Sequence, residues 1–135
     1  MKTSQIVYLG ELRTEAVHML SGKKITTDAP PDNQGKGEFF SPTDLLATSL
    51  GSCMLTIMGI TARAHNFSIV GTKVDISKIM GTEPRRVIEI VVGFSFPSIE
   101  LTTKQRKLLE AAARECPVAK SLNTELKQTV VFNYS

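Results

Sequence analysis

The sequence offers few residues of the kinds that carry enzyme chemistry, with two cysteines and two histidines among 135 residues. The cysteines, Cys53 and Cys116, lie 63 positions apart and form no C-x-x-C pair. No two of Cys53, Cys116, His18 and His65 have a spacing typical of a zinc site. The G-x-S-x-G motif of many serine hydrolases is also missing. A bound metal and a serine nucleophile are therefore not expected, and the two thiols are either inert or redox-active.

Two further absences bear on partners and location. Positive charge is not concentrated, because the net charge is only +3 and the lysines and arginines are scattered, so we expect no nucleic-acid partner. The N-terminal residues contain no long apolar run before charges intervene, so we expect no signal peptide and a cytoplasmic location. A permanent structural disulfide is not expected in that compartment.

One apolar stretch reaches the length of a transmembrane candidate. Residues 45–62 contain no charged side chain. The same stretch contains seven serine, threonine and glycine residues, which favours the central helix of a soluble protein over a lipid-facing segment. We therefore expect no membrane association.

The remaining pattern predicts one α+β domain over residues 1–135, with antiparallel sheets around a long central helix. Ser41 and Asp44 flank the start of the long helix, and Thr102 with Gln105 forms a capping box for a second helix. Helices are expected at residues 42–64, from residue 103, and from residue 117. Strands are expected at residues 4–9, 11–19, 25–27, 69–79, 87–96 and 128–134.

Position alone suggests different roles for the two cysteines. Cys53 lies within the long apolar helix, which is a poor environment for a thiolate, so core packing is its simplest interpretation. Cys116 precedes Pro117 and would occupy the cap position of a helix that begins there, where unpaired N–H groups favour a thiolate. A helix-terminating residue without chemical function fits the same spacing.

Two motifs together resemble the OsmC/Ohr family, the osmotically inducible and organic hydroperoxide resistance proteins. The first is S-P-T-D-L-L-A-T-S-L-G-S-C-M, residues 41–54, and the second is C-P-V-A-K-S-L, residues 116–122. The separation of the cysteines and the order of elements also agree with the family. The sequence is similar to a divergent OsmC-like branch, because Thr43 stands where the best-known peroxidases have glutamate and the acid follows one residue later, at Asp44.

The resemblance implies an intertwined homodimer with thiol-dependent peroxidase sites at the subunit interface. Cys53 would be the peroxidatic cysteine that attacks an organic hydroperoxide, and Cys116 the resolving cysteine that forms a disulfide with it. The resemblance implies no bound cofactor, and an external thiol, such as the dithiol of a lipoyl group, would reduce that disulfide. Arg13, the only arginine before the long helix, would stabilise the Cys53 thiolate, with Asp44 as its candidate partner.

The apolar helix suits an alkyl or lipid hydroperoxide as substrate. Phe39, Phe40, Leu50 and Met54 are candidate walls of the substrate pocket, and each also suits a plain core role. Thr43 motivates a second hypothesis, a stress-response or hydrophobic-ligand-binding protein that keeps the fold without efficient peroxidase turnover. A redox sensor is a third hypothesis, for which the sequence names no partner.

Overall fold

The chain folds into two units in the computed structural model, which describes residues 1–134. The first unit comprises Met1–Leu46 and the second begins at Ala47. The long helix α1 (Pro42–Ala64) starts in the first unit and continues into the second. The organisation of residues 1–135 as a single domain stays a prediction.

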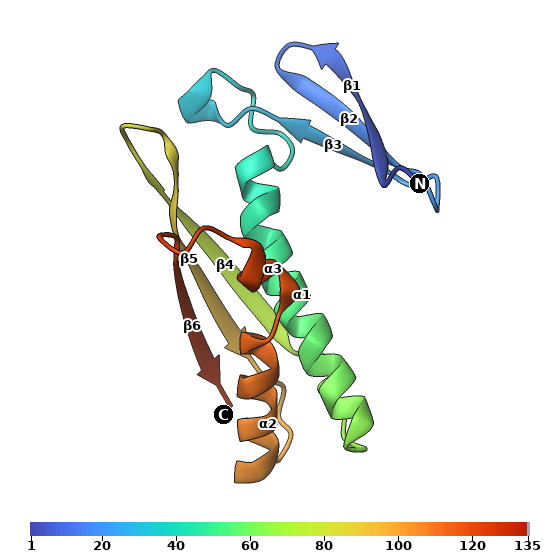
Figure 1. Cartoon of the computed structure of the whole chain (residues 1–135), viewed down its shortest axis with the longest axis vertical. Helices are drawn as coiled ribbons and strands as arrows, with labels where there is room; N and C mark the ends of the chain where they lie inside the picture. Colours follow the sequence, from blue (N-terminus) through green and yellow to red (C-terminus); the bar gives the residue numbers. More distant parts are fainter. Residues whose placement is uncertain (135) are drawn as a thin grey trace. The chain divides into compact units, whose positions relative to one another are not determined.

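The first unit is built on a three-stranded antiparallel sheet in the order β1-β2-β3 (Figure 1). Its strands are β1 (Ser4–Gly10), β2 (Arg13–His18) and β3 (Lys24–Asp28). A tight turn with positive φ at Gly10, Glu11 and Leu12 joins the first two strands, and the predicted hairpin turn joins the next two. A 3-10 helix, η1 (Pro31–Asn33), lies within the long loop that follows β3.

The second unit packs helices over one face of a three-stranded sheet in the order β4-β5-β6 (Figure 1). Its core contains apolar residues from α1, β5 and α2, together with Ile69, Phe96, Leu101 and Cys116. Gly51 lets α1 approach the sheet closely, because a Cβ at this position would lie 2.5 Å from Cδ1 of Ile76 on β4. The elements besides α1 are β4 (Lys73–Gly81), β5 (Arg86–Ser95), α2 (Thr103–Arg114), α3 (Pro117–Ser121) and β6 (Lys127–Asn133).

Helices α1 and α2 begin at the predicted capping residues. At the start of α1, the Ser41 hydroxyl accepts a hydrogen bond from the backbone N–H of Asp44 at 3.0 Å, and the Asp44 carboxylate accepts one from the N–H of Ser41 at 2.9 Å. Thr102 and Gln105 form the same reciprocal arrangement at α2. By length and composition α1 could cross a membrane, but the core helix of a soluble protein has the same properties, and six α1 residues are buried.

The structure corrects two parts of the predicted fold. The sheet of the second unit is not wholly antiparallel, because β6 pairs with β5 in parallel. Two helices connect these strands and carry the chain back to the end of the sheet where β5 begins, so β6 runs in the same direction as β5. The strand predicted at 69–79 begins at Lys73 instead, because Gly71 has a positive φ and the N–H of Thr72 bonds back to the carbonyl of Ile69.

Candidate functional site

The two cysteines meet within the second unit, although 63 positions separate them. Cys53 is a half-buried residue of α1, and its side chain packs against the hydrophobic core. Cys116 is fully buried and is the N-cap of α3, because Pro117 ends one helical segment and begins the next. A hydrogen bond with Cys53 contributes to the raised pKa of Cys116, so the two thiols lie near each other. The fold thus brings a thiol of α1 beside the thiol at the start of α3.

The environment of Cys116 keeps this residue a neutral thiol. Burial raises its pKa most, and the hydrogen bond with Cys53 raises it further. The backbone N–H groups of Ala119 and Val118 act in the opposite direction, and that of Ala119 lies 3.4 Å from Cys116 Sγ. The predicted cap position is confirmed, but the helix N–H groups do not outweigh burial. Cys116 is therefore poorly suited to begin a nucleophilic reaction, and the more exposed Cys53 is the thiol that an incoming molecule meets first.

Arg13 lies in the first unit, where two carboxylates hold its guanidinium. Its Nε and Nη2 donate to the two oxygens of Asp28 at 2.7 and 2.9 Å, and Nη2 also donates to Glu38 Oε1 at 2.7 Å. The ring of Phe39 faces the guanidinium at 4.8 Å. The paired register of β2 and β3 places Arg13 directly opposite Asp28. The arginine predicted as thiolate stabiliser is thus held in one orientation by residues of its own unit.

This ion pair shifts both titrations toward the charged forms. The bond from Arg13 lowers the pKa of Asp28, whose side chain is only 1% exposed, and the backbone N–H of Glu38 adds a further hydrogen bond at 3.0 Å. The carboxylates of Asp28 and Glu38 raise the pKa of Arg13 in turn. Asp28 therefore stays ionised although its side chain is buried.

The carboxylates at Arg13 were not among the predicted site residues. Asp28 ends β3 opposite Arg13, so a hairpin register counted from the predicted turn could have identified it. Glu38 belongs to the irregular loop before α1, which carries no periodic signal. The Asp44 carboxylate binds the backbone of Ser41 as a cap, and its role as partner of Arg13 stays a prediction. The action of Arg13 on Cys53, which belongs to the other unit, likewise stays a prediction.

The candidate pocket walls fall into two groups. Leu50 and Met54 are completely or almost completely buried and belong to the core of the second unit. Phe39 and Phe40, in the first unit, are about half exposed. The contribution of all four residues to a substrate pocket stays a prediction.

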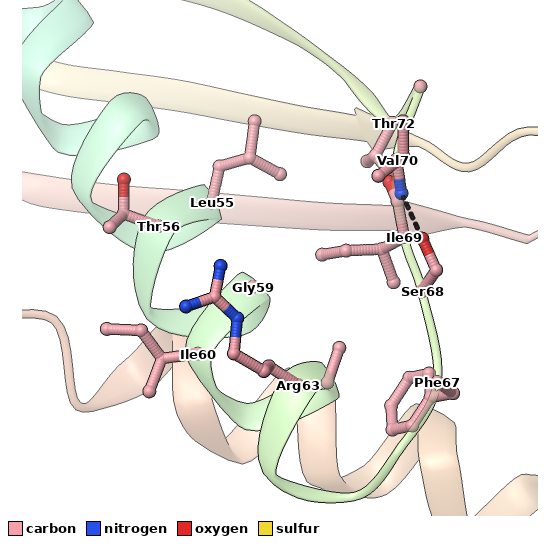
Figure 2. A pocket seen from close by; sticks show the side chains of 12 residues that line it. Leu55, Thr56, Gly59, Ile60, Arg63, Phe67, Ser68, Ile69, Val70 and Thr72 are labelled. Atoms are coloured by element: carbon pink, nitrogen blue, oxygen red, sulfur yellow. Dashed lines mark hydrogen bonds between the residues drawn. The ribbon is translucent and has the colours of Figure 1, made fainter.

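A cavity of about 700 Å³ lies between the second half of α1 and residues 67–72, within the second unit (Figure 2). Its lining is mainly apolar, with Leu55 and Ile69 pointing into it from opposite sides. Arg63 is the charged residue of the lining, and Figure 2 shows its side chain lying along the helix toward Gly59. Gly59 leaves open space where a side chain would stand. None of the predicted site residues lines this cavity. The spacing of the lining residues in the sequence does not distinguish them from core residues, so the cavity could not be predicted from it.

Residues 1–134 contain no group of three or more His, Cys, Asp or Glu side chains that could hold a metal ion. The pair of thiols is the site in the second unit to which the two cysteine motifs contribute. Fold and site together define an α+β protein with a half-buried and a buried thiol in contact on neighbouring helices.

Comparison with known proteins assigns this fold to a family. The profile of the OsmC-like protein family matches residues 35–131, which is well over half of the chain. None of the curated proteins matches the sequence. The chain belongs to the OsmC family, as its two cysteine motifs predicted.

Three solved structures illustrate the likeness. A Psychrobacter arcticus protein, provisionally described as an osmotic stress induced and detoxification response protein, is 51% identical, with a TM-score of 0.95 over 98% of this chain and 96% of that chain. An organic hydroperoxide resistance protein OsmC from Legionella pneumophila is 15% identical, with a TM-score of 0.73 over 99% and 98% of the two chains. A Vibrio cholerae protein, provisionally described as an organic hydroperoxide resistance protein and holding captopril in one of its active sites, is 15% identical, with a TM-score of 0.74 over 100% and 94%. At 15% identity, the last two likenesses show the fold alone.

Proposed function

We propose that this protein is a thiol-dependent peroxidase that reduces organic hydroperoxides. The observation that carries the proposal is the contact between two thiols of unequal exposure, Cys53 half-buried and Cys116 fully buried. A peroxidatic cysteine must meet its substrate, whereas a resolving cysteine must meet only its partner thiol. Membership of the OsmC family and the names of the Legionella and Vibrio proteins, which refer to organic hydroperoxide resistance, support a role in peroxide stress.

The proposed reaction has three steps. The Cys53 thiolate attacks the terminal oxygen of the hydroperoxide and breaks the O–O bond, which gives a Cys53 sulfenic acid and, with one proton, an alcohol. The Cys116 thiol condenses with the sulfenic acid to form the Cys53–Cys116 disulfide and water. An external dithiol, such as a lipoyl group, then reduces the disulfide by two thiol–disulfide exchanges and becomes oxidised itself. No bound cofactor takes part in the proposed cycle.

The proposal includes a cytoplasmic homodimer in which Arg13 supports the Cys53 thiolate. The exposed apolar residues of β1 favour association with a second copy, because Ile6, Val7, Tyr8 and Leu9 are each at least 53% exposed. Consecutive strand residues point to opposite faces of a sheet, so both faces of β1 present apolar side chains to solvent. Sedimentation equilibrium tests the homodimer, and a monomer at micromolar concentration would contradict it.

A turnover assay with variants of each cysteine tests the peroxidase proposal. Purified wild type should consume tert-butyl or cumene hydroperoxide when supplied with dihydrolipoamide, and it should be less active with hydrogen peroxide. Cys53→Ser should abolish turnover, whereas Cys116→Ser should react with one equivalent of hydroperoxide and then be recycled poorly by the dithiol. Wild-type turnover no faster than that of Cys53→Ser would refute the proposal.

The cavity beside Arg63 favours a second candidate function, the binding of an anionic amphiphile such as a fatty acid. Its volume of about 700 Å³ is within the usual range for small-molecule sites, and Arg63 lies beside apolar walls that suit an acyl chain. Native mass spectrometry of the purified protein should then detect a copurified acid that Arg63→Glu removes. Arg114→Glu, a change in the last turn of α2 outside the cavity lining, is the matched control and should retain the acid. Unreactive thiols together with a bound acid would favour this function over the peroxidase, and no bound acid in wild type would refute it.

A further inference from the structure

A polar side chain of the sheet bonds to the short helix that follows Cys116. Gln128, on β6, donates from Nε2 to the backbone carbonyl of Ala119 at 3.0 Å. Helix α3 has only five residues, and an isolated helix of that length is not stable. The carbonyl of Ala119 has no i+4 backbone N–H donor within α3, because residue 123 lies beyond the end of the helix. The Gln128 amide therefore satisfies a helix-end carbonyl and fixes the position of α3.

The same alanine also contacts the buried thiol. The N–H of Ala119 donates to Cys116 Sγ at 3.4 Å, and Cys116 is in hydrogen-bonding contact with Cys53. A continuous series of polar contacts thus runs from the Gln128 amide through the backbone of Ala119 to the two sulfur atoms. The series joins β6, α3 and α1, and every member of it belongs to the second unit.

The position of Gln128 in the sheet makes this contact specific. Gln128 pairs with Ile90 in the parallel register of β5 and β6, and Ile90 is fully buried in the core. Paired residues share a face of a sheet, so Gln128 lies on the face that otherwise carries apolar core residues such as Phe132. Gln128 is half-buried on this face, and its amide finds a hydrogen-bond acceptor there in the carbonyl of Ala119.

We infer that Gln128 is a positioning residue for Cys53–Cys116 disulfide formation. It holds α3 so that Cys116 Sγ remains beside Cys53, whereas the position of Cys53 itself is set by α1. Loss of the Gln128 hydrogen bond should therefore disfavour disulfide formation and leave the first attack on a hydroperoxide unchanged. The biological meaning of this inference rests on the proposed peroxidase function, but the positioning itself can be measured without a peroxide.

Equilibration with glutathione measures the positioning directly. Glutathione disulfide oxidises the two protein thiols to the Cys53–Cys116 disulfide and releases two molecules of glutathione. Gln128→Met keeps a similar volume and removes the donor. It should lower the equilibrium constant, at most about fivefold, because α3 of the reduced variant can then move Cys116 away from Cys53 and one hydrogen bond contributes about 1 kcal/mol. Gln128→Lys restores a donor and should recover most of the loss. Thr129→Val removes the neighbouring hydrogen bond on β6, between Thr129 and Glu89, and should leave the constant unchanged.

The outcomes separate this inference from the proposed function. The inference would be overturned if the equilibrium constant of Gln128→Met stayed within about 1.5-fold of wild type, because the loss of a hydrogen bond that positions Cys116 should change it by more. Equal losses in Gln128→Met, Gln128→Lys and Thr129→Val would overturn it too, because they would indicate a general loosening of the sheet. A loss confined to Gln128→Met in a protein that does not consume hydroperoxides would uphold the positioning and refute only the peroxidase.

A measurement on the unmodified protein covers the case in which Gln128→Met does not fold. In wild type, one side-chain amide proton of Gln128 should exchange with solvent far more slowly than those of Gln34, an exposed residue of the loop before α1. NMR hydrogen exchange can resolve the two residues. Equal exchange rates for the side-chain amides of Gln128 and Gln34 would overturn the inference.

Discussion

Oxidation of the two thiols should raise the thermal stability of the protein. A Cys53–Cys116 disulfide closes a loop of 63 residues and removes conformations from the unfolded chain. The chain-entropy relation gives about 4 kcal/mol of stabilisation at 25 °C for a loop of this length. Because the thiols are already in contact in the reduced structure, little of this gain should be lost to rearrangement of α1 or α3. For a chain of this size the gain corresponds to a rise in melting temperature of about 10 to 15 °C.

Differential scanning calorimetry at one protein concentration can test this value. The reduced protein is compared with protein oxidised by diamide, after mass spectrometry has established that the disulfide is present. Cys116→Ser, treated in the same way, is the control and should show no shift. An unchanged or lower melting temperature in the disulfide form would refute the reasoning, because it would mean that bond formation distorts the native packing around Cys116.

Three further predictions follow from the environments of individual residues. Since burial and its contact with Cys53 raise the pKa of Cys116, iodoacetamide at pH 8 should label Cys53 first, and faster labelling of Cys116 in peptide maps would contradict the assignment. The lowered pKa of Asp28 stabilises the fold above about pH 4, and this stabilisation is lost as the pH falls further. In urea unfolding, Asp28→Asn should therefore have a lower free energy of unfolding than wild type at pH 7, and the difference should narrow at about pH 2.5. A difference that stays constant with pH would exclude the link to Arg13. Leu109→Ala should cost about 2 to 5 kcal/mol in urea unfolding because Leu109 is fully buried, and a cost below about 1 kcal/mol would argue against the described core.

The features that could be predicted from the sequence depend on neighbouring residues. The capping pairs at Ser41 and Thr102 act over three positions, so their roles can be recognised without knowing the rest of the fold. Pro117 is suited to the first position of α3 by its own fixed backbone angle, and this makes Cys116 the cap residue. Family resemblance then supplied the expectation that Cys53 and Cys116 act together, and the two thiols are in contact.

The features that could not be predicted depend on which segments meet in space. The parallel pairing of β6 with β5 is set by the path of the intervening helices, which no periodicity in residues 127–133 reveals. Glu38 reaches Arg13 from an irregular loop, so only the folded chain identifies it as a partner. Gln128 is read in isolation as a polar residue of a strand, and its contact with Ala119 becomes visible only when β6 lies beside α3.

Peptide mapping after treatment with one equivalent of hydroperoxide tests the central claim most directly. The reduced protein is treated with cumene hydroperoxide, its free thiols are blocked, and it is digested and analysed under non-reducing conditions. The account predicts a Cys53–Cys116 cross-linked peptide in wild type, and a Cys53 sulfenic acid that dimedone traps in Cys116→Ser. Two free, unmodified thiols in wild type after the hydroperoxide treatment would contradict it.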